Sequence, residues 1–376
     1  MAVYKIKLTP IDSFFFGGVR TFNNDKREHL YREDKQNYFI RSEKFPQQSA
    51  ILGMLRYQLL AQKGLLDYNQ HTQGEEVASL IGTKGFSPAI ENNGYEKIKD
   101  ISPVFLSNDT EYLIPHSLDF NYATDEQIAI RQIIPDFNNA RQQVFTTSSE
   151  GWKTAADSSG TYVYKYRNPE LLINYDGTKA YKYDFEEGYK RNIIFQKNFI
   201  LENGIFYPFT KIGIDKEKPD EAFYKQERYQ LGKGWAFSFY VDCEEELING
   251  HTFMGAERSC FEFSVEKTAT QNIKANDMFK SKFENAFNHL TGLDAVVLTS
   301  DAFMEYGFLT RNSLHHISEF RDYKAMPGNF RSLKRSEQYV LIKRGSVIYK
   351  PTEDFFIKIN DKHFQTIGYN HFIVKT

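Results

Sequence analysis

The sequence predicts an α+β fold. An alternating apolar strand over residues 3–16 opens the chain, and an amphipathic helix over residues 49–64 follows it. Residues 235–265 are expected to run strand, short helix, loop and strand. Together this order indicates a ferredoxin-like βαββαβ domain with large insertions. A length of 376 residues suggests two or three domains.

The opening strand leads into a long polar excursion. Apolar and polar residues alternate through Tyr4–Thr9 before three aromatic residues, Phe14–Phe16. Residues 17–48 are polar and charged, and they are too many for an ordinary loop. We therefore expect a projecting hairpin, with Tyr38–Ile40 as its returning strand.

The clearest helix comes next, and the pattern then weakens. Ser49 is the expected N-cap of this helix, and Gly64 is its C-terminal stop. Residues 101–117 predict two short strands around a turn. The periodicity weakens from 120 to 200, where residues 146–160 predict a loop. The apolar face of the helix comprises Ile51, Leu52, Leu55 and Leu59.

Strand periodicity returns after residue 234. Residues 235–243 predict a strand, residues 244–250 a short acidic helix, residues 251–259 a glycine-containing loop and residues 261–265 a second strand. The last hundred residues repeat this theme weakly. They predict a helix in 278–290, a strand in 294–304, a hairpin over 338–350 turning at Arg344-Gly345, and a glycine loop feeding a strand in 364–374.

Composition excludes several classes of protein. The net charge of −2 means that any nucleic-acid site must be a local basic patch. The two cysteines, Cys243 and Cys260, form neither a disulfide framework nor a metal motif. The start is a strand pattern rather than a signal peptide, and no apolar run is long enough to span a membrane. A soluble, cytoplasmic protein with reduced thiols is expected.

No motif for catalysis, phosphate binding or metal binding is present. The adjacent His315 and His316 point to different faces of a helix or strand, so they are not expected to share a metal. Carboxylates are scattered without a metal-binding cluster. A metal-free ribonuclease needs only one histidine as general base, and three candidates exist, His29, His116 and His251. Each is more simply explained as a surface or hydrogen-bonded residue.

Basic residues gather in two places. Residues 311–350 hold nine Lys or Arg against three acids, interleaved with Tyr323, Phe330 and Tyr339. This pattern suits a single-strand groove, although a solvated face opposite acidic protein explains it equally well. The excursion over 20–44 holds seven bases against five acids, and such a loop is usually only solvated.

The stretch SFFFGGVRTF, residues 13–22, places two glycines and Arg20 directly after an apolar strand end. Glycine lacks a Cβ, so backbone N–H groups can approach a phosphate closely. An arginine can then clamp the phosphate with two parallel hydrogen bonds. The alternative is a plain turn with Arg20 paired to a carboxylate.

Six stretches in order resemble one family. They are FFFGGVRTF, FPQQSAILGMLR, FTKIGIDKEKPDEAFYKQERYQL, FMGAERSCFEF, LIKRGSVIYK and IGYNHFIV, spread from near residue 10 to 373. The chain resembles the third subunit of the Cmr effector, the type III-B CRISPR module of the RAMP superfamily. The Lys-Ile-Gly-Ile segment at 211–214 is the most specific match. Where the family often has two adjacent glycines, Ala256 follows Gly255 here.

The resemblance implies two ferredoxin-like RRM-type domains, 1–268 with a thumb-like hairpin and other insertions, and a degenerate 269–376. It implies a subunit without nuclease activity or cofactor that holds the 5′ tag of the CRISPR RNA. It would bridge the large polymerase-like subunit to the backbone RAMP subunits and meet target RNA indirectly. Tyr31, Tyr38 or Phe39 is expected to stack on nucleotides. The expected RNA contacts are Gly17, Gly18, Arg20, Lys26, Arg27, Arg32, Tyr38, Phe39, Lys44, Ser49, Gly255, Ala256, Glu257, Arg258, Arg331, Lys334, Arg335, Gly368, Tyr369 and Asn370.

Three other readings stay open. The first is a metal-independent RAMP endoribonuclease that processes precursor CRISPR RNA. The second is an interaction module that contacts no RNA. The third is the equivalent subunit of a type III-A complex, against which the Lys-Ile-Gly-Ile match argues.

Overall fold

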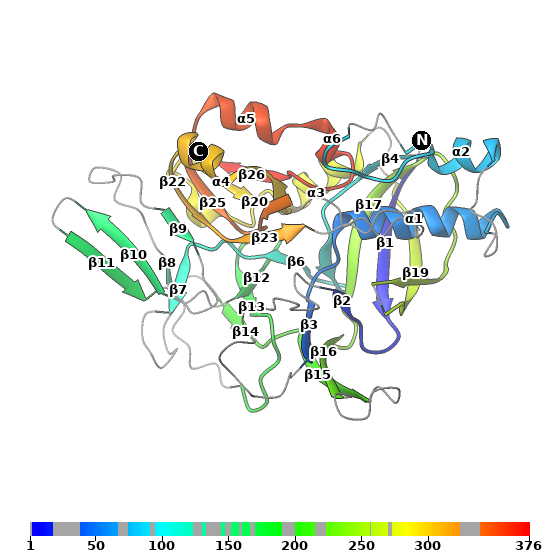
Figure 1. Ribbon diagram of the computed structural model, residues 1–376, viewed down its shortest axis with the longest axis horizontal. Coiled ribbons are helices and arrows are strands. Elements are labelled where there is room, and N and C mark those ends of the chain that lie inside the picture. The colour runs from blue at the N-terminus through cyan, green and yellow to red at the C-terminus, as the bar shows by residue number, and fades with distance from the viewer. Residues whose placement is uncertain are drawn as a thin grey trace, which may run out of the picture.

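A computed structural model of the chain has an α+β architecture with many strands and few helices (Figure 1). Within the residues that it describes, no helix is long and apolar enough to cross a membrane. The described residues are 2–17, 38–66, 74–90, 95–122, 130–132, 144–146, 152–157, 160–165, 170–189, 200–214, 223–255, 257–269, 273–323 and 339–376.

One large sheet organises the N-terminal part, and its neighbouring strands are antiparallel except for the β13–β14 pair. At its centre β1 (Ala2–Pro10) lies between β17 and β19, and β4 (Ile98–Ile101) also pairs with β17. The strand order is β14 (Ile200–Glu202), β13 (Lys179–Lys182), β12 (Leu171–Asn174), β6 (Tyr112–Pro115), β5 (Phe105–Ser107), β17 (Ala236–Cys243), β1, β19 (Ser259–Lys267) and β18 (Gly250–Met254).

Helix α1 (Gln48–Gln62) covers one face of this sheet (Figure 1). Ile51, Leu55 and Leu59 are buried in the same core cluster as Ile6 and Phe239. On the opposite face, α3 (Ala275–Phe283) packs Phe279 and Phe283 against Phe105. Because both faces are covered, every residue of β17 is buried, and its exposure does not alternate although its sequence does.

A second sheet organises the C-terminal part, where Phe355 and Ile359 of α5 (Glu353–Ile359) share a core cluster with Val296 and Ile348. Its strand order is β26 (Phe372–Lys375), β20 (Ala295–Leu298), β25 (Val347–Pro351), β22 (Ser313–Ser318) and β9 (Val144–Thr146). The short helices are α2 (Glu75–Ile81), the 3-10 helix η2 (Asn288–Leu290), α4 (Tyr306–Arg311) and α6 (Lys362–Gln365).

Four smaller sheets complete the described part. One joins β15 (Phe206–Ile214), β16 (Phe223–Leu231), β3 (Tyr38–Glu43) and β2 (Phe16–Gly17), and β3 returns antiparallel beside β2 as the excursion predicts. The others pair β21 (Ala302–Phe303), β24 (Tyr339–Ile342) and β23 (Phe320–Tyr323), then β10 (Trp152–Asp157) with β11 (Gly160–Lys165), and β7 (Phe120–Tyr122) with β8 (Ile130–Gln132).

The structure corrects the expected first strand and helix cap. The first strand ends at Pro10 rather than Phe16, because the chain bends at residues 11–12 and Phe14 then pairs with Tyr229 of β16. Helix α1 begins at Gln48 with Gln47 as its N-cap, two residues before the expected cap, so Ser49 lies inside its first turn. The predicted stop is confirmed, since Gly64 has a φ of +69° just after the helix.

Four later expectations are also wrong. Residues 244–249 form no helix, because Glu244 is instead held against β4 through Lys97 and Lys99. Residues 250–254 are strand β18 rather than a loop, and residues 152–157 are strand β10. The segment over 338–350 turns at Arg344-Gly345, but its two strands, β24 and β25, join different sheets.

A half-buried carboxyl group on β4, beside α3, predicts a pH-dependent stability. Burial, and then the negative charge of Asp242, raises the pKa of Asp100 to about 7, although Lys274 and Lys362 oppose this rise. Unfolded Asp ionises near pH 3.9. Between about pH 4 and pH 7 the folded chain therefore holds a proton that the unfolded chain lacks, and stability falls as pH rises.

We expect Asp100→Asn to raise the free energy of unfolding by roughly 1–3 kcal/mol at pH 8 and to leave it unchanged at pH 4. Asn can still accept the hydrogen bond that Asn276 Nδ2 donates to Oδ1 of Asp100. Denaturant unfolding at the two pH values measures both effects. Asp109→Asn is the matched control, since the Asp109 side chain is fully exposed. An equal gain at pH 4 and pH 8 would contradict the ionisation argument.

Candidate nucleic-acid interface

The structure brings together two of the glycine positions that the sequence singles out. A Cβ on Gly255 would lie 2.2 Å from the carbonyl oxygen of Phe15, and Gly255 has a φ of +80°. The N–H of Phe15 donates to Ser259 Oγ at 3.0 Å. The β18–β19 turn therefore lies directly against the strand end at Phe15–Gly17. The space that glycine leaves at 255 is taken by the chain's own carbonyl group rather than left for a phosphate.

Arg228 of β16 stabilises this junction between the Phe15–Gly17 strand end and the β18–β19 turn through hydrogen bonds. Its Nε donates to Ser13 Oγ at 3.0 Å, and its Nη2 donates to the Ser13 carbonyl oxygen at 2.8 Å and to Ser259 Oγ at 3.2 Å. The guanidinium group thus joins the first strand end to the turn from inside the protein. Sequence reasoning missed Arg228, because no local pattern distinguishes it from the other charged residues of β16, Lys225 and Glu227.

The outer side of the same turn presents charge and an aromatic ring. Glu257 and Arg258 are both exposed, and Arg258 has a φ of +49°. The Arg258 guanidinium carbon lies 5.3 Å from the ring centroid of Phe253, which is itself 42% exposed. An exposed cation beside an exposed ring is the combination that contacts phosphate and base in single-stranded RNA.

A second exposed cation lies on the neighbouring small sheet. Arg41 of β3 has a side chain that is 66% exposed, and its Nε is 2.7 Å from Glu227 Oε1 of β16. Gly17 is half-buried, and a Cβ there would meet no atom of the described residues within 4 Å. Gly17 is therefore not required sterically by this chain.

Several predicted contacts lie outside what the structure describes. For Tyr38 and Phe39 only the backbone, in β3, is described. The residues outside the described ranges are Gly18, Arg20, Lys26, Arg27, Tyr31, Arg32, Ala256, Arg331, Lys334 and Arg335.

Lys44 and Ser49 face the chain itself. Lys44 Nζ lies 3.2 Å from Glu170 and 3.1 Å from Asp184, and its side chain is only 17% exposed. The N–H of Ser49 donates to the hydroxyl of Tyr369 at 3.4 Å. These contacts do not support the prediction that either residue meets RNA.

The second glycine loop is interior rather than exposed. Tyr369 and Asn370 are fully buried. Asn370 Oδ1 accepts a hydrogen bond from Phe303 N at 2.8 Å, and Asn370 N donates to the Asp301 carbonyl oxygen at 3.1 Å. The predicted RNA contacts at Gly368, Tyr369 and Asn370 are thus unsupported, because these residues instead anchor the C-terminal part to its own core.

A glycine-to-alanine change at 368 is expected to be strongly destabilising. Gly368 has a φ of +90°, and a Cβ there would lie 1.8 Å from Gln48 Nε2 and 2.8 Å from the Ser102 carbonyl oxygen. Gln48 Nε2 donates to Ser102 O and Ile367 O, so the clash would also disrupt buried hydrogen bonds. Backbone strain and broken bonds together are expected to cost at least about 2 kcal/mol.

Gly234→Ala is a matched control for this change. Gly234 has a similar φ of +83°, but within the described part of the chain a Cβ there would meet nothing within 4 Å. The difference in unfolding free energy between Gly368→Ala and Gly234→Ala, measured by chemical denaturation, isolates the clash. Equal losses would mean that the loop at 368 rearranges freely.

The basic cluster over 311–350 is largely internal where it is described. Arg321 Nη2 lies 3.2 Å from Asp301 Oδ2, and Arg344 Nε lies 3.3 Å from Asp301 Oδ1. Lys343 Nζ lies 3.0 Å from Glu319. Three of the nine bases are thus paired with acids of the chain itself, and they neither line a groove nor form the solvated face of the alternative explanation.

The histidine candidates for general-base chemistry are dispersed. His116 is 3% exposed, and His251 is exposed on β18. His29 lies outside the described residues. His315 and His316 are buried in β22, where burial lowers the pKa of His315 to about 4.

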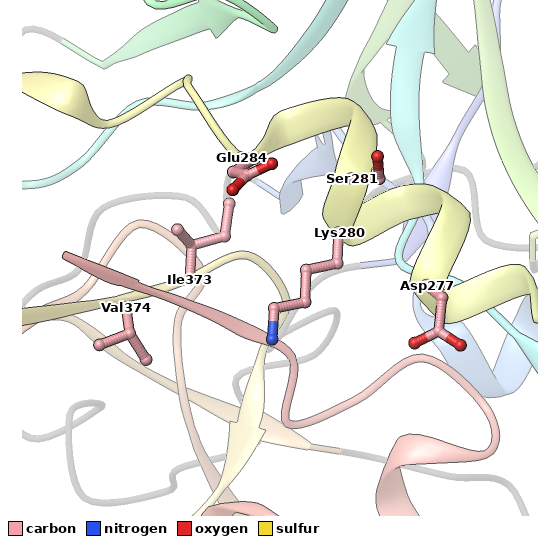
Figure 2. A pocket seen from close by; sticks show the side chains of 6 residues that line it. All are labelled: Asp277, Lys280, Ser281, Glu284, Ile373 and Val374. Carbon is pink, nitrogen blue, oxygen red and sulfur yellow. The ribbon is translucent and has the colours of Figure 1, made fainter.

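A shallow groove lies between α3 and β26 (Figure 2). Asp277 and Lys280 come from the helix, Glu284 is its C-cap, and Ile373 and Val374 come from the strand. Two acids against one base make this groove an unsuitable site for a phosphate backbone.

Comparisons with known proteins agree with the resemblance drawn from the sequence. A family model described as "CRISPR-associated protein (Cas_Cmr3)" matches residues 6–347. No curated protein matches the chain.

Among solved structures, a chain in the cryo-EM structure of the Type III-B Cmr-beta bound to cognate target RNA shares the fold. The TM-score is 0.51 at 13% identity, covering 98% of this chain and 96% of that one. A chain in the same complex with AMPPnP scores 0.48 at 12% identity, with 99% of each covered. A chain of the Csm3-Csm4 subcomplex in the type III-A CRISPR-Cas interference complex scores 0.39 at 10% identity, with 93% of each covered. Since the family model spans nearly the whole sequence, the chain belongs to the Cmr3 family of CRISPR-associated proteins.

Proposed function

We propose that this chain is a non-catalytic, RNA-binding subunit of a type III-B CRISPR effector complex. It holds the 5′ tag of the CRISPR RNA, bridges the large polymerase-like subunit to the backbone RAMP subunits, and meets target RNA only indirectly. The observation that carries the proposal is the junction of the Phe15–Gly17 strand end with the 255–258 turn. This junction presents Arg258 and Phe253 together at the surface.

Rigidity of the junction supports a binding role. The Arg228 hydrogen bonds and the Phe15–Ser259 bond fix the backbone behind the exposed pair. A preorganised site loses less conformational entropy when a flexible RNA strand docks. Stacking of one base is worth roughly 1–3 kcal/mol, so few contacts are needed when other subunits hold the rest of the RNA.

Exposed apolar side chains support contacts with other subunits. Tyr207 and Phe209 lie on one face of β15 and are 37% and 48% exposed. The ring of Phe185 stacks on Tyr207 with a centroid separation of 4.3 Å. Gathered apolar side chains at a surface mark protein interaction sites. This patch is a candidate for one of the two bridging contacts.

The strand order supports a ferredoxin-like arrangement for the proposed domain 1–268. In the order β5, β17, β1 and β19 all neighbours are antiparallel, and α1 lies in the chain between β1 and β5. This is the order expected of a βαββαβ unit, with β18 in place of the second helix. The second domain, 269–376, stays a proposal built on the sheet that contains β20, β22, β25 and β26.

Crosslinking mass spectrometry on the complex purified with its RNA tests the function. Nucleotide adducts from the 5′ tag at residues 253–258, and at Arg20, would support the tag-holding role. A chain that copurifies with the large subunit but carries no RNA adduct would instead be an interaction module. Cleavage of repeat RNA by the purified chain without metal would overturn the non-catalytic assignment.

A further inference from the structure

A buried cluster of metal-ligand side chains lies away from the proposed interface. His116 and Asp119 come from the segment between β6 and β7, and His289 comes from η2. His116 and Asp119 are 3% and 0% exposed, and the His289 side chain is 8% exposed. One ligand atom from each residue lies within 4.8 Å of the other two. We propose that His116, Asp119 and His289 bind a divalent transition-metal ion, with Zn²⁺ as the expected occupant.

The distances fit a small coordination sphere. His289 Nε2 lies 3.6 Å from Asp119 Oδ2. Ser117 Oγ lies 3.0 Å from His116 Nδ1 and 3.1 Å from His289 Nε2, so both rings point a nitrogen at one hydroxyl group. Nitrogen and oxygen ligands at about 2.0–2.1 Å from a tetrahedral Zn²⁺ are roughly 3.4 Å apart. The individual separations of 3.0, 3.1 and 3.6 Å bracket this value, and no two ligand atoms of His116, Asp119 and His289 are more than 4.8 Å apart. Small side-chain movements would therefore close these donors around an ion, with Ser117 Oγ as the fourth.

The charge of Asp119 needs compensation. Among the described residues, no Lys or Arg forms an ion pair with this fully buried carboxylate, and its Oδ1 accepts no hydrogen bond. Its Oδ2 accepts one hydrogen bond from Gln132 Nε2 at 2.8 Å. Buried charges in proteins are paired or coordinate metals. Its ion-pair partner among the described residues is His289, which is charged only if it is protonated. A divalent cation shared with the two imidazoles would balance the carboxylate without that proton.

The donor set indicates the class of ion. Imidazole nitrogen favours zinc and other late transition metals over Mg²⁺ and Ca²⁺, which prefer oxygen. Gln132 would act as the residue that orients the carboxylate ligand, as outer partners of metal ligands commonly do. The ion would join the end of β6 in the large sheet to η2, which follows α3. Its expected role is structural, as a link between the N-terminal and C-terminal parts.

Metal content of the untagged full-length chain is the first test. After incubation with Zn²⁺ and desalting, elemental analysis is expected to find about one ion per chain. Zn²⁺ should raise the melting temperature, and a chelator should lower it. Co²⁺ substitution should give the absorption bands of a tetrahedral site with nitrogen and oxygen ligands. A folded chain that takes up neither ion would overturn the proposal and leave a metal-free hydrogen-bonded cluster.

Variants locate the ion. Asp119→Asn and His289→Gln should abolish the bound equivalent, while Gln132→Ala should weaken affinity roughly 10–100-fold. His371→Gln is the matched control, since its imidazole bonds Gln365 O outside the cluster. An equal loss of metal in the control would place the ion elsewhere and reject this site. If the ligand variants fail to fold, the Co²⁺ absorption spectrum of the natural chain still tests the proposal, because a tetrahedral nitrogen and oxygen site has characteristic bands.

Discussion

Replacing Asp301 by alanine is expected to lower the free energy of unfolding by about 3–5 kcal/mol. Asp301 is fully buried and lies within 3.3 Å of both Arg344 Nε and Arg321 Nη2. Its Oδ1 also accepts a hydrogen bond from the Arg344 N–H at 3.0 Å. Removing the carboxylate would leave two guanidinium groups in the interior without their shared counter-charge, and that desolvation cost is large.

The ion pairs of Asp301 with Arg321 and Arg344 also predict that the folded state loses stability in acid. Burial alone would raise the pKa of Asp301, but the charges of Arg321 and Arg344 outweigh it and hold the pKa well below its usual range. Since the folded pKa is depressed, this stabilisation is present above the unfolded pKa, near 3.9, and is lost as pH falls below it. The melting temperatures of the natural chain and of the Asp301→Ala variant should therefore become equal at low pH.

Asp109→Ala is the matched control for this prediction. The Asp109 side chain is fully exposed and lies 3.9 Å from Lys7, a surface pair expected to contribute at most about 1 kcal/mol. Chemical denaturation at neutral pH compares the two variants. A loss at Asp301 no larger than that at Asp109 would mean that the network relaxes and the two arginines reach solvent.

Removing the charge of Arg258 is expected to weaken binding of the CRISPR RNA tag about 10-fold or more. Arg258→Gln keeps most of the side-chain length while losing the cation that lies beside Phe253. If the guanidinium meets one phosphate, the slope of log affinity against log salt concentration should fall by roughly 0.7. Fluorescence anisotropy with single-stranded tag RNA, across several salt concentrations, measures both quantities.

Lys358→Gln controls for general loss of positive charge. Lys358 is exposed on α5, in the C-terminal part (Figure 1). The Lys358→Gln substitution should leave unchanged both the affinity for the tag RNA and the slope of log affinity against log salt concentration. Equal effects at Lys358 and Arg258 would indicate nonspecific attraction by the whole protein. An unchanged slope with weaker binding would mean that Arg258 acts by stacking rather than on a phosphate.

Local periodicity correctly predicted the helices and strands whose own apolar residues repeat with the period of that element. The helix with Ile51, Leu55 and Leu59 on one face is α1, and the alternating run after Trp235 is β17. The predictions that failed depend on distant partners. Residues 244–249 are acidic and helix-like in composition, but Glu244 is held by Lys97, just before β4, and by Lys99 of β4.

Charge counting failed for the same reason. Residues 311–350 carry an excess of bases, yet Arg321, Lys343 and Arg344 are paired with Asp301 and Glu319. Asp301 precedes the counted window, so a local sum of charges omits it. The proposed metal ligands were likewise hidden, because His289 is far in sequence from His116 and Asp119.

Three glycines show how far prediction from the local sequence reaches. The sequence by itself marked Gly255, Gly345 and Gly368 as turn positions, and all three have positive φ values, because backbone conformation is a local property. Only the tertiary structure decided what approaches each one. The neighbours are the Phe15 carbonyl at Gly255, the His116 carbonyl at Gly345 and the Gln48 side chain at Gly368. Contacts through space depend on how distant segments pack, and the local pattern of residues does not encode that packing.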